Sequence, residues 1–124
     1  MIDNILLIEK AIEAQSKAIC PYSNYPVGVA LLTNENNIVS GFNIESKAYP
    51  TTLCAERVAI FSALSQGYNK FKSLAIVTND AAMPCGSCRQ IIHEFAGDIL
   101  ILISDTNKNY TKTTIKELLP HPFG

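Results

Sequence analysis

The sequence predicts an α/β fold, a three-layer α/β/α sandwich with a mixed five-stranded sheet. Two β-rich segments precede the first internal helical segment, and strands alternate with helices after it. This order favours a sheet with both antiparallel and parallel pairs and with helices on both faces. The length of 124 residues suits one domain, residues 1–124, with one hydrophobic core.

The first part of the chain is predicted to form a helix followed by a hairpin. Asp3 is a plausible N-cap, and isoleucines at helical spacing extend the pattern over residues 3–19, before Pro21 stops it. Residues 27–33 and 38–45 are β-rich, and the NENN segment between them is typical of a hairpin turn.

The rest of the chain is predicted to alternate helices and strands. The helical patterns are closed by Gly67 and Gly97, and ILILIS is apolar on both faces, as in the middle of a covered sheet. The expected elements are helices over 54–66 and 85–96, strands over 73–79 and 99–104, a short edge strand in YTKTT and a final helical turn in TIKELLP.

Composition and charge exclude several classes of partner. Ten Lys and Arg residues stand against eleven Asp and Glu residues, scattered along the chain. We therefore expect no nucleic acid partner, because phosphate binding needs a basic stripe. The longest purely apolar run, ILILI, is too short to cross a bilayer. The N-terminus lacks the features of a signal peptide, so we predict a cytoplasmic protein without membrane contact.

Three of the four cysteines stand where helices are predicted to begin. Cys54 opens one helix, and Cys85 and Cys88 open the next with their thiols about one turn apart. A C-x-x-C pattern alone also fits a redox pair or half of a structural zinc site, but a redox pair leaves Cys54 unexplained. Helix N-termini favour thiolate over thiol. We therefore predict that the two helix starts converge and bind one Zn²⁺ per subunit.

The fourth coordination position decides between a catalytic and a structural zinc site. Cys20, at the end of the first predicted helix, is expected to be a small core residue. His93 is expected to be a surface or hydrogen-bonded histidine, and His121 lies in a Pro-flanked tail that is expected to be solvated. We therefore predict an open site with water in the fourth position.

Glu56 lies two residues after Cys54, in the first turn of the same predicted helix. Acidic residues are favoured there by the helix dipole alone. Beside a three-thiolate zinc, however, the carboxylate can reach the metal-bound water without being a ligand. That position suits a general acid and base.

C-x-E followed by P-C-x-x-C is the signature of the zinc-dependent nucleoside and nucleobase deaminases. The likeness goes further, because several blocks in order over almost the whole chain resemble the short, homotetrameric cytidine deaminases. These blocks are PYSNYPVGVAL, GFNIE, YPTTLCAER, PCGSCRQ and ELLPHPF.

The resemblance implies a cytidine deaminase-like fold and assigns the metal centre. Cys54, Cys85 and Cys88 match the zinc ligands, and Glu56 matches the proton shuttle. Arg57 matches an arginine that hydrogen-bonds the ligand sulfurs and offsets the negative charge of three thiolates.

The resemblance also assigns the substrate contacts. Asn43 and Glu45 match the pair that holds the ribose hydroxyls, and Tyr25 matches an aromatic residue, usually Phe, that lines the pocket. The backbone around Ala55 and Pro84 would contact the base and the leaving amine.

Further matches concern a neighbouring subunit and the 5′ end of the substrate. Tyr49 and Phe123 match residues that reach a neighbour's site, which implies a homotetramer with sites near subunit interfaces. Ser46, Lys47 and Met83 depart from the residues that are common in the family, and these departures bear on substrate preference.

The sequence thus predicts zinc-dependent hydrolytic deamination of cytidine and deoxycytidine to uridine and deoxyuridine with release of ammonia, in pyrimidine salvage. One alternative is the same chemistry on a modified nucleoside or a blasticidin-type antibiotic, against which Asn43 and Glu45 favour a plain nucleoside. A further alternative is a non-catalytic zinc-stabilised module, in which Cys20 or a histidine closes the site.

Overall fold

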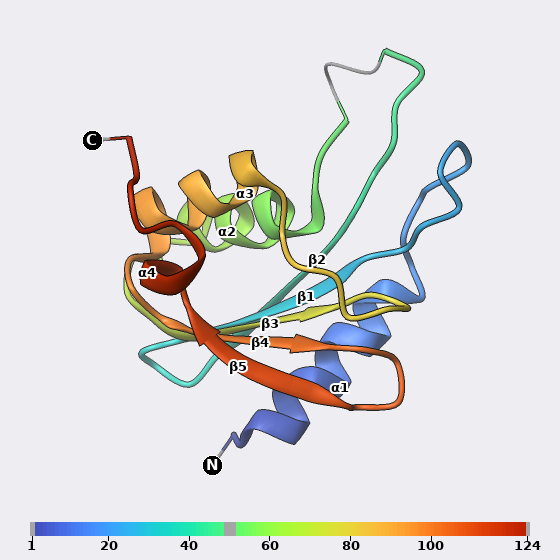
Figure 1. Cartoon of the computed structure of the whole chain (residues 1–124). Coiled ribbons are helices and arrows are strands. Elements are labelled where there is room, and N and C mark those ends of the chain that lie inside the picture. Colours follow the sequence, from blue (N-terminus) through green and yellow to red (C-terminus); the bar gives the residue numbers. More distant parts are fainter. Residues whose placement is uncertain (1, 49–51, 124) are drawn as a thin grey trace.

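The chain folds around a five-stranded sheet of mixed direction. A computed structural model describes residues 2–48 and 52–123, so the predicted site residue Tyr49 lies outside the described part. From the N-terminus, the elements are α1 (Asn4–Gln15), β1 (Gly28–Thr33), β2 (Ile38–Phe42), α2 (Ala55–Ser65), β3 (Phe71–Val77), α3 (Gly86–Ile91), the π-helix η2 (Ile92–Ala96), β4 (Leu100–Ser104), β5 (Tyr110–Thr114) and α4 (Ile115–Leu118), as Figure 1 shows.

The strand order is β2-β1-β3-β4-β5. β3 and β4 pair in parallel, and the other neighbours pair antiparallel. A parallel pair needs a crossover, which α3 and η2 supply between β3 and β4. The mixed sheet is therefore as predicted, and YTKTT forms its edge strand β5.

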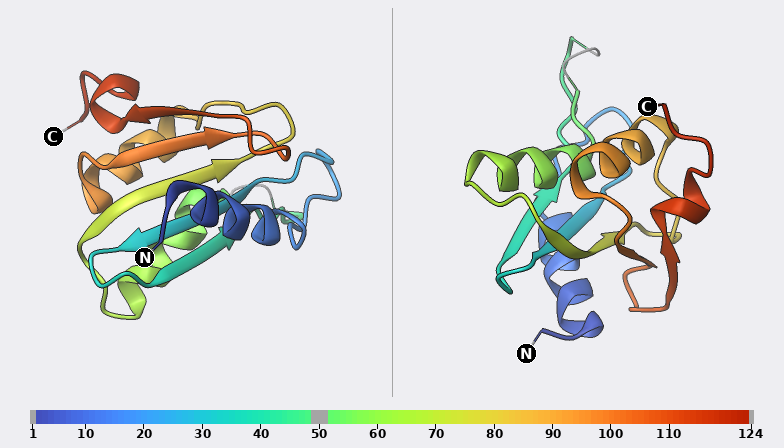
Figure 2. Two further views of the ribbon diagram at one scale, coloured as in Figure 1. Left: turned by 90° about the horizontal axis from the view of Figure 1, so that it is seen from below. Right: turned by 90° about the vertical axis from the view of Figure 1, so that its left-hand side faces the viewer.

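Helices cover both faces of the sheet (Figure 2). On one face, α1 packs through Leu7, Ile8 and Ala11 against residues of β1, β3 and β4. On the other face, a larger cluster joins α2 and η2 to the opposite side of the same strands. Every residue of β1 is buried, as expected for a central strand covered on both sides. No helix in the described part of the chain is both long and apolar enough to cross a membrane.

The first helix is shorter than predicted. It ends at Gln15, and Ile19 pairs instead with Ile44 in an isolated parallel bridge. The backbone N–H of Ile19 donates to Asn43 O at 3.0 Å, and its carbonyl accepts from Glu45 N at 2.8 Å. These two bonds replace the helical ones for this residue, so the helical spacing of its side chain was misleading.

Other predicted elements differ in their bounds or in their bonding. The strand predicted over 73–79 lies at Phe71–Val77. The strand predicted over 38–45 ends at Phe42, and only Ile44 continues in single bridges to Ile19 and Leu53. The helix predicted over 85–96 changes to π-helical bonding after Ile91, where the amide of Gly97 reaches back to Ile92 O at 3.0 Å.

Two buried glycines let helices approach the sheet closely. A Cβ at Gly41 would lie 2.6 Å from both Ala55 O and Ala59 N of α2. A Cβ at Gly28 would overlap the backbone of α1 on the opposite face. Because backbone atoms cannot move aside as side chains can, both positions require glycine. Gly41 in particular sets how near the start of α2 lies to β2.

We expect Gly41→Ala and Gly28→Ala each to lower the free energy of unfolding by about 1–3 kcal/mol, the usual cost of overpacking. Chemical denaturation measures this loss. Gly86→Ala is the control, because a Cβ there meets no atom within 4 Å. A Gly41→Ala variant as stable as this control would contradict the close-approach argument.

Candidate metal centre and active site

The structure brings the three predicted cysteines together. Cys54 is the N-cap of α2 and Cys85 is the N-cap of α3, and both have extended backbone. Cys88 follows in the first turn of α3. The three Sγ atoms lie within 4.8 Å of one another, and those of Cys85 and Cys88 are 3.3 Å apart. The predicted convergence of two helix starts is therefore present.

Hydrogen bonds within the group favour a thiolate at Cys54. A hydrogen bond from the Cys88 thiol, followed by the Arg57 guanidinium, lowers the pKa of Cys54 to about 5. Donating that bond and being buried raise the pKa of Cys88. Arg57 Nη2 lies 3.8 Å from Cys54 Sγ and 3.1 Å from Thr52 O, so the predicted arginine–sulfur contact exists. The guanidinium thus offsets negative charge on sulfur.

The donor set fits zinc. Three sulfurs at the N-termini of two helices form a soft, anionic group suited to Zn²⁺. Within the described residues, the group includes no fourth cysteine, histidine or carboxylate. This is the pattern of a site that keeps one position open.

The three candidates for a fourth ligand lie elsewhere. Cys20 is half-buried and follows the end of α1 by several residues, so the prediction of a core residue at a helix end is wrong. His93 is half-buried in η2, and His121 is exposed, as predicted for a solvated tail.

Glu56 is buried beside the sulfur group. It lies in the first turn of α2, its side chain is only 5% exposed, and it lines the same cavity as Cys54 and Cys85. Burial raises the pKa of its carboxyl group, and the charge of Cys54 raises it further. A carboxyl group in such surroundings takes up a proton more readily than one in water. Its position and environment suit proton transfer.

A cavity of about 480 Å³ opens above these groups. Its wall comes from the segment before β1, the residues that follow β2, the residues that lead into α2 with the first turn of that helix, and the β3–α3 loop. It contains most of the predicted substrate contacts, namely Tyr25, Asn43, Glu45, Ala55 and Pro84. The volume is within the range of small-molecule sites.

The side chains of Asn43 and Glu45 form hydrogen bonds with the segment before β1. Asn43 accepts from Val27 N and donates to Tyr25 O, both at 2.9 Å. Glu45 accepts from Tyr22 N at 2.9 Å and from the amide and hydroxyl of Ser23 at 3.1 and 2.5 Å. The hydrogen bond from the Ser23 hydroxyl is the main cause of the lowered pKa of Glu45. Both side chains therefore also shape the wall of the cavity that they line.

The sequence did not reveal Ser23 or Asp80. Ser23 lines the cavity and holds Glu45, whereas Asp80 accepts a hydrogen bond from the Tyr25 hydroxyl at 2.5 Å. The turn-forming segment PYSNYP was the only sequence signal for Ser23. The aspartate lies in a loop without periodicity, so no local pattern pointed to it.

Phe123 lies outside the cavity. Its side chain is 89% exposed, and its backbone pairs with the Gln90 amide at 2.9 and 3.0 Å. Phe123 does not line the cavity of its own chain, so its contact with a neighbour stays a prediction.

Arg89 is a residue that the sequence reasoning missed. It donates to Pro84 O and to Leu118 O, both at 2.8 Å, and so ties the metal loop to α4.

Comparisons with known proteins agree with this geometry. Residues 1–103 match the family model described as the cytidine and deoxycytidylate deaminase zinc-binding region. A cytidine deaminase of Sporosarcina psychrophila is 43% identical over 121 residues, which cover 95% of this chain and 89% of that protein. A blasticidin-S deaminase of Bacillus cereus is 35% identical, over 79% of this chain and 76% of that protein.

A solved structure has the same fold. The crystal structure of cytidine deaminase from Burkholderia pseudomallei superposes with a TM-score of 0.94 at 37% identity, covering 98% of this chain and 100% of that one. The three cysteines all lie within the residues 1–103 that match this zinc-binding region. The chain therefore belongs to the cytidine and deoxycytidylate deaminase zinc-binding family.

Proposed function

We propose that the protein is a zinc-dependent deaminase of cytidine and deoxycytidine, which converts them with water into uridine, deoxyuridine and ammonia. The observation that carries this proposal is the meeting of three thiols beside one cavity, which Cys54, Cys85 and the buried Glu56 line. Cytidine deaminases similar over nearly the full length support the substrate class. A nucleoside substrate also fits the cavity of about 480 Å³.

Cys54, Cys85 and Cys88 would hold the metal as thiolates. When bound there, zinc supplies Lewis acidity that activates a water molecule near neutral pH. Arg57, through its contact with Cys54 Sγ, draws negative charge away from the sulfurs. The group can therefore remain an effective Lewis acid in spite of three anionic ligands.

Glu56 would move the protons of the reaction. Its carboxylate would take a proton from the attacking water and give it to N3 of the pyrimidine. It would then take the remaining proton of the hydroxyl now on C4, which becomes the carbonyl oxygen, and deliver it to the departing amine. The raised pKa of this carboxyl suits both directions of transfer, because a general acid and base works best near the pH of the reaction.

Other residues would orient the nucleoside. Asn43 and Glu45 would meet the ribose hydroxyls, and the Tyr25 ring would form one wall of the cavity. The backbone at Ala55 and Pro84 would contact the base and the amine. Each of these residues lines the cavity that Cys54 and Cys85 also line, which supports the assignment.

We further propose a homotetramer in which Tyr49 and Phe123 reach a neighbouring site, and a cytoplasmic location. The high exposure of the Phe123 ring, on a backbone held by Gln90, supports a contact outside its own chain. An exposed aromatic ring that is held in place in this way is suited to packing against a partner.

The second candidate function is the same chemistry on a blasticidin-type antibiotic. Similarity to the blasticidin-S deaminase of Bacillus cereus favours it. The presence of both Asn43 and Glu45 in the cavity favours a plain nucleoside instead.

Zinc content should depend on the three cysteines. We expect about one zinc per chain in the wild type and a strong loss of zinc in Cys54→Ala and Cys88→Ala, measured by metal analysis of chelator-free preparations. Cys20→Ala is the matched control and should keep its zinc, because Cys20 lies outside the group. Full zinc content in the first two variants would refute the assignment.

Glu56→Gln should keep zinc and lose turnover. The amide has nearly the same shape but cannot shuttle protons, so we expect kcat to fall by about 10²–10⁴-fold. Absorbance loss on deamination of cytidine measures the rate. Glu13→Gln on the exposed face of α1 is the control. Wild-type turnover by Glu56→Gln would exclude the carboxylate from catalysis.

A substrate panel should separate the two candidate functions. We expect cytidine and deoxycytidine to be deaminated with the highest kcat/KM, ahead of their 5′-monophosphates and blasticidin S. Half-buried Glu45 and exposed Asp80, whose hydrogen bonds lower their pKa values, keep negative charge near the cavity at neutral pH. That charge disfavours an anionic 5′ group. Preference for blasticidin S would favour the second candidate.

A further inference from the structure

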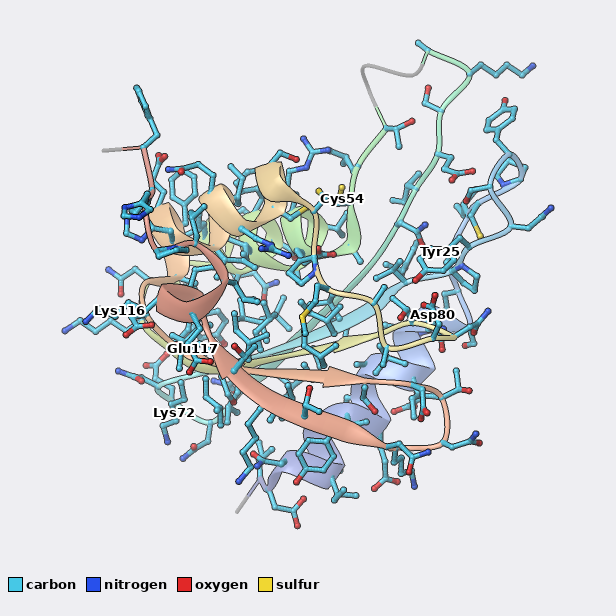
Figure 3. All side chains as sticks on the ribbon, viewed as in Figure 1. Tyr25, Cys54, Lys72, Asp80, Lys116 and Glu117 are labelled. Atoms are coloured by element: carbon cyan, nitrogen blue, oxygen red, sulfur yellow. The ribbon has the colours of Figure 1, made fainter. Side chains whose placement is uncertain are left out.

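One hydrogen bond joins the two loops that border the cavity. The Tyr25 hydroxyl, from the segment before β1, donates to Asp80 Oδ1 in the β3–α3 loop at 2.5 Å. Figure 3 shows the two side chains beside each other at the end of the sheet.

The bond is charge-assisted over a wide range of pH. Burial and the bond to Asp80 raise the pKa of Tyr25, and the bond from Tyr25 lowers that of Asp80. The tyrosine therefore stays a donor and the aspartate stays an anionic acceptor near neutral pH. Hydrogen bonds of this type are among the stronger ones in proteins.

Asp80 also belongs to a network inside its own loop. Thr78 Oγ1 donates to Asp80 Oδ1 at 3.2 Å and accepts from Ala82 N at 2.8 Å. Ala81, which lies between Asp80 and Ala82 in the chain, has a φ of +55°, in the left-handed region that alanine rarely adopts. The loop therefore holds an unfavourable backbone conformation, which needs contacts of this kind to persist.

The same loop leads directly into the metal centre. Thr78, Ala82, Met83 and Pro84 line the cavity, and Cys85 follows as the N-cap of α3. A change in the path of the loop would therefore alter the cavity wall on the side of the metal.

We propose, building on the deaminase function above, that Asp80 is a positioning residue: by accepting from the Tyr25 hydroxyl it fixes both the Tyr25 ring and the loop that carries Pro84. The bond shapes the wall that receives the nucleoside and takes no part in proton transfer. Its loss should weaken substrate binding and leave the chemical step nearly unchanged, because the wall is the same in the ground state and the transition state.

A double-mutant cycle on the holoenzyme tests this coupling. Tyr25→Phe keeps the ring and Asp80→Ala removes the acceptor, so each should raise the KM of cytidine about tenfold, with kcat changed by less than about twofold. The double variant should be no worse than either single variant. Multiplication of the two effects, or an unchanged KM in both single variants, would overturn the proposal.

Two further variants separate positioning from general loss of stability. Asp80→Asn keeps an acceptor oxygen and should restore part of the lost affinity. Asp105→Ala removes a similar carboxylate, which accepts from the amides of Asn107 and Asn109 in the β4–β5 loop and does not line the cavity of the site. It should keep the wild-type KM. A KM raised as much by Asp105→Ala would reduce the effect of Asp80 to general stability and refute the proposal.

Amide hydrogen exchange provides a readout that does not depend on activity. Exchange over residues 79–85 should become faster in Tyr25→Phe and stay unchanged in Asp105→Ala, because only the former releases the loop. Unchanged exchange in Tyr25→Phe would refute the positioning role even if the enzyme were active. If the wild type failed to deaminate cytidine, the proposed function would fall, and the exchange result alone would decide whether Asp80 fixes the loop.

Discussion

The site depends on the forced proximity of three sulfur atoms. Three thiolates within 4.8 Å of one another would repel strongly, and without a metal the group is limited to sharing protons, with a thiolate favoured at Cys54. A divalent cation removes this repulsion. Metal binding at such a site therefore adds to the stability of the fold, in addition to its chemical role. The positive ends of the helix dipoles and the Arg57 guanidinium offset the remaining negative charge on the sulfur atoms.

The sheet determines where this proximity occurs. β1 runs antiparallel to β2 and β3, so the start of β1 lies beside the ends of both, where Gly28 pairs with Phe42 and Val77. The segment before β1 and the β3–α3 loop therefore lie at the same end of the strands. Gly41, which has no side chain, lets α2 pack close to β2 near this end. The cavity is thus a consequence of topology and of one close helix–sheet contact.

Local sequence patterns predicted those features of the site that depend on residues close together in the sequence. The cysteines at helix starts and Glu56 in a first turn could be located because N-caps and helical periodicity extend over only a few residues. The helix predicted to Ile19 was too long because a pairing with residues 43–45 overrides its spacing. The bond from Tyr25 to Asp80 joins residues 55 positions apart, and nothing near either one in the sequence records it. Hydrogen bonds between residues far apart in the sequence, such as this one beside the site, therefore could not be predicted from local patterns.

The tie made by Arg89 has a practical consequence. Because its guanidinium donates to both Pro84 O and Leu118 O, one side chain joins the segment before Cys85 to the end of α4. Figure 1 shows the C-terminal end of the chain above α4, away from the N-terminus at the bottom of the view. Removal of α4 would take away Leu118 O, one of the two acceptors that hold the Arg89 guanidinium beside Pro84. A change in this C-terminal helix would therefore reach the segment before Cys85, although the two are far apart in the sequence.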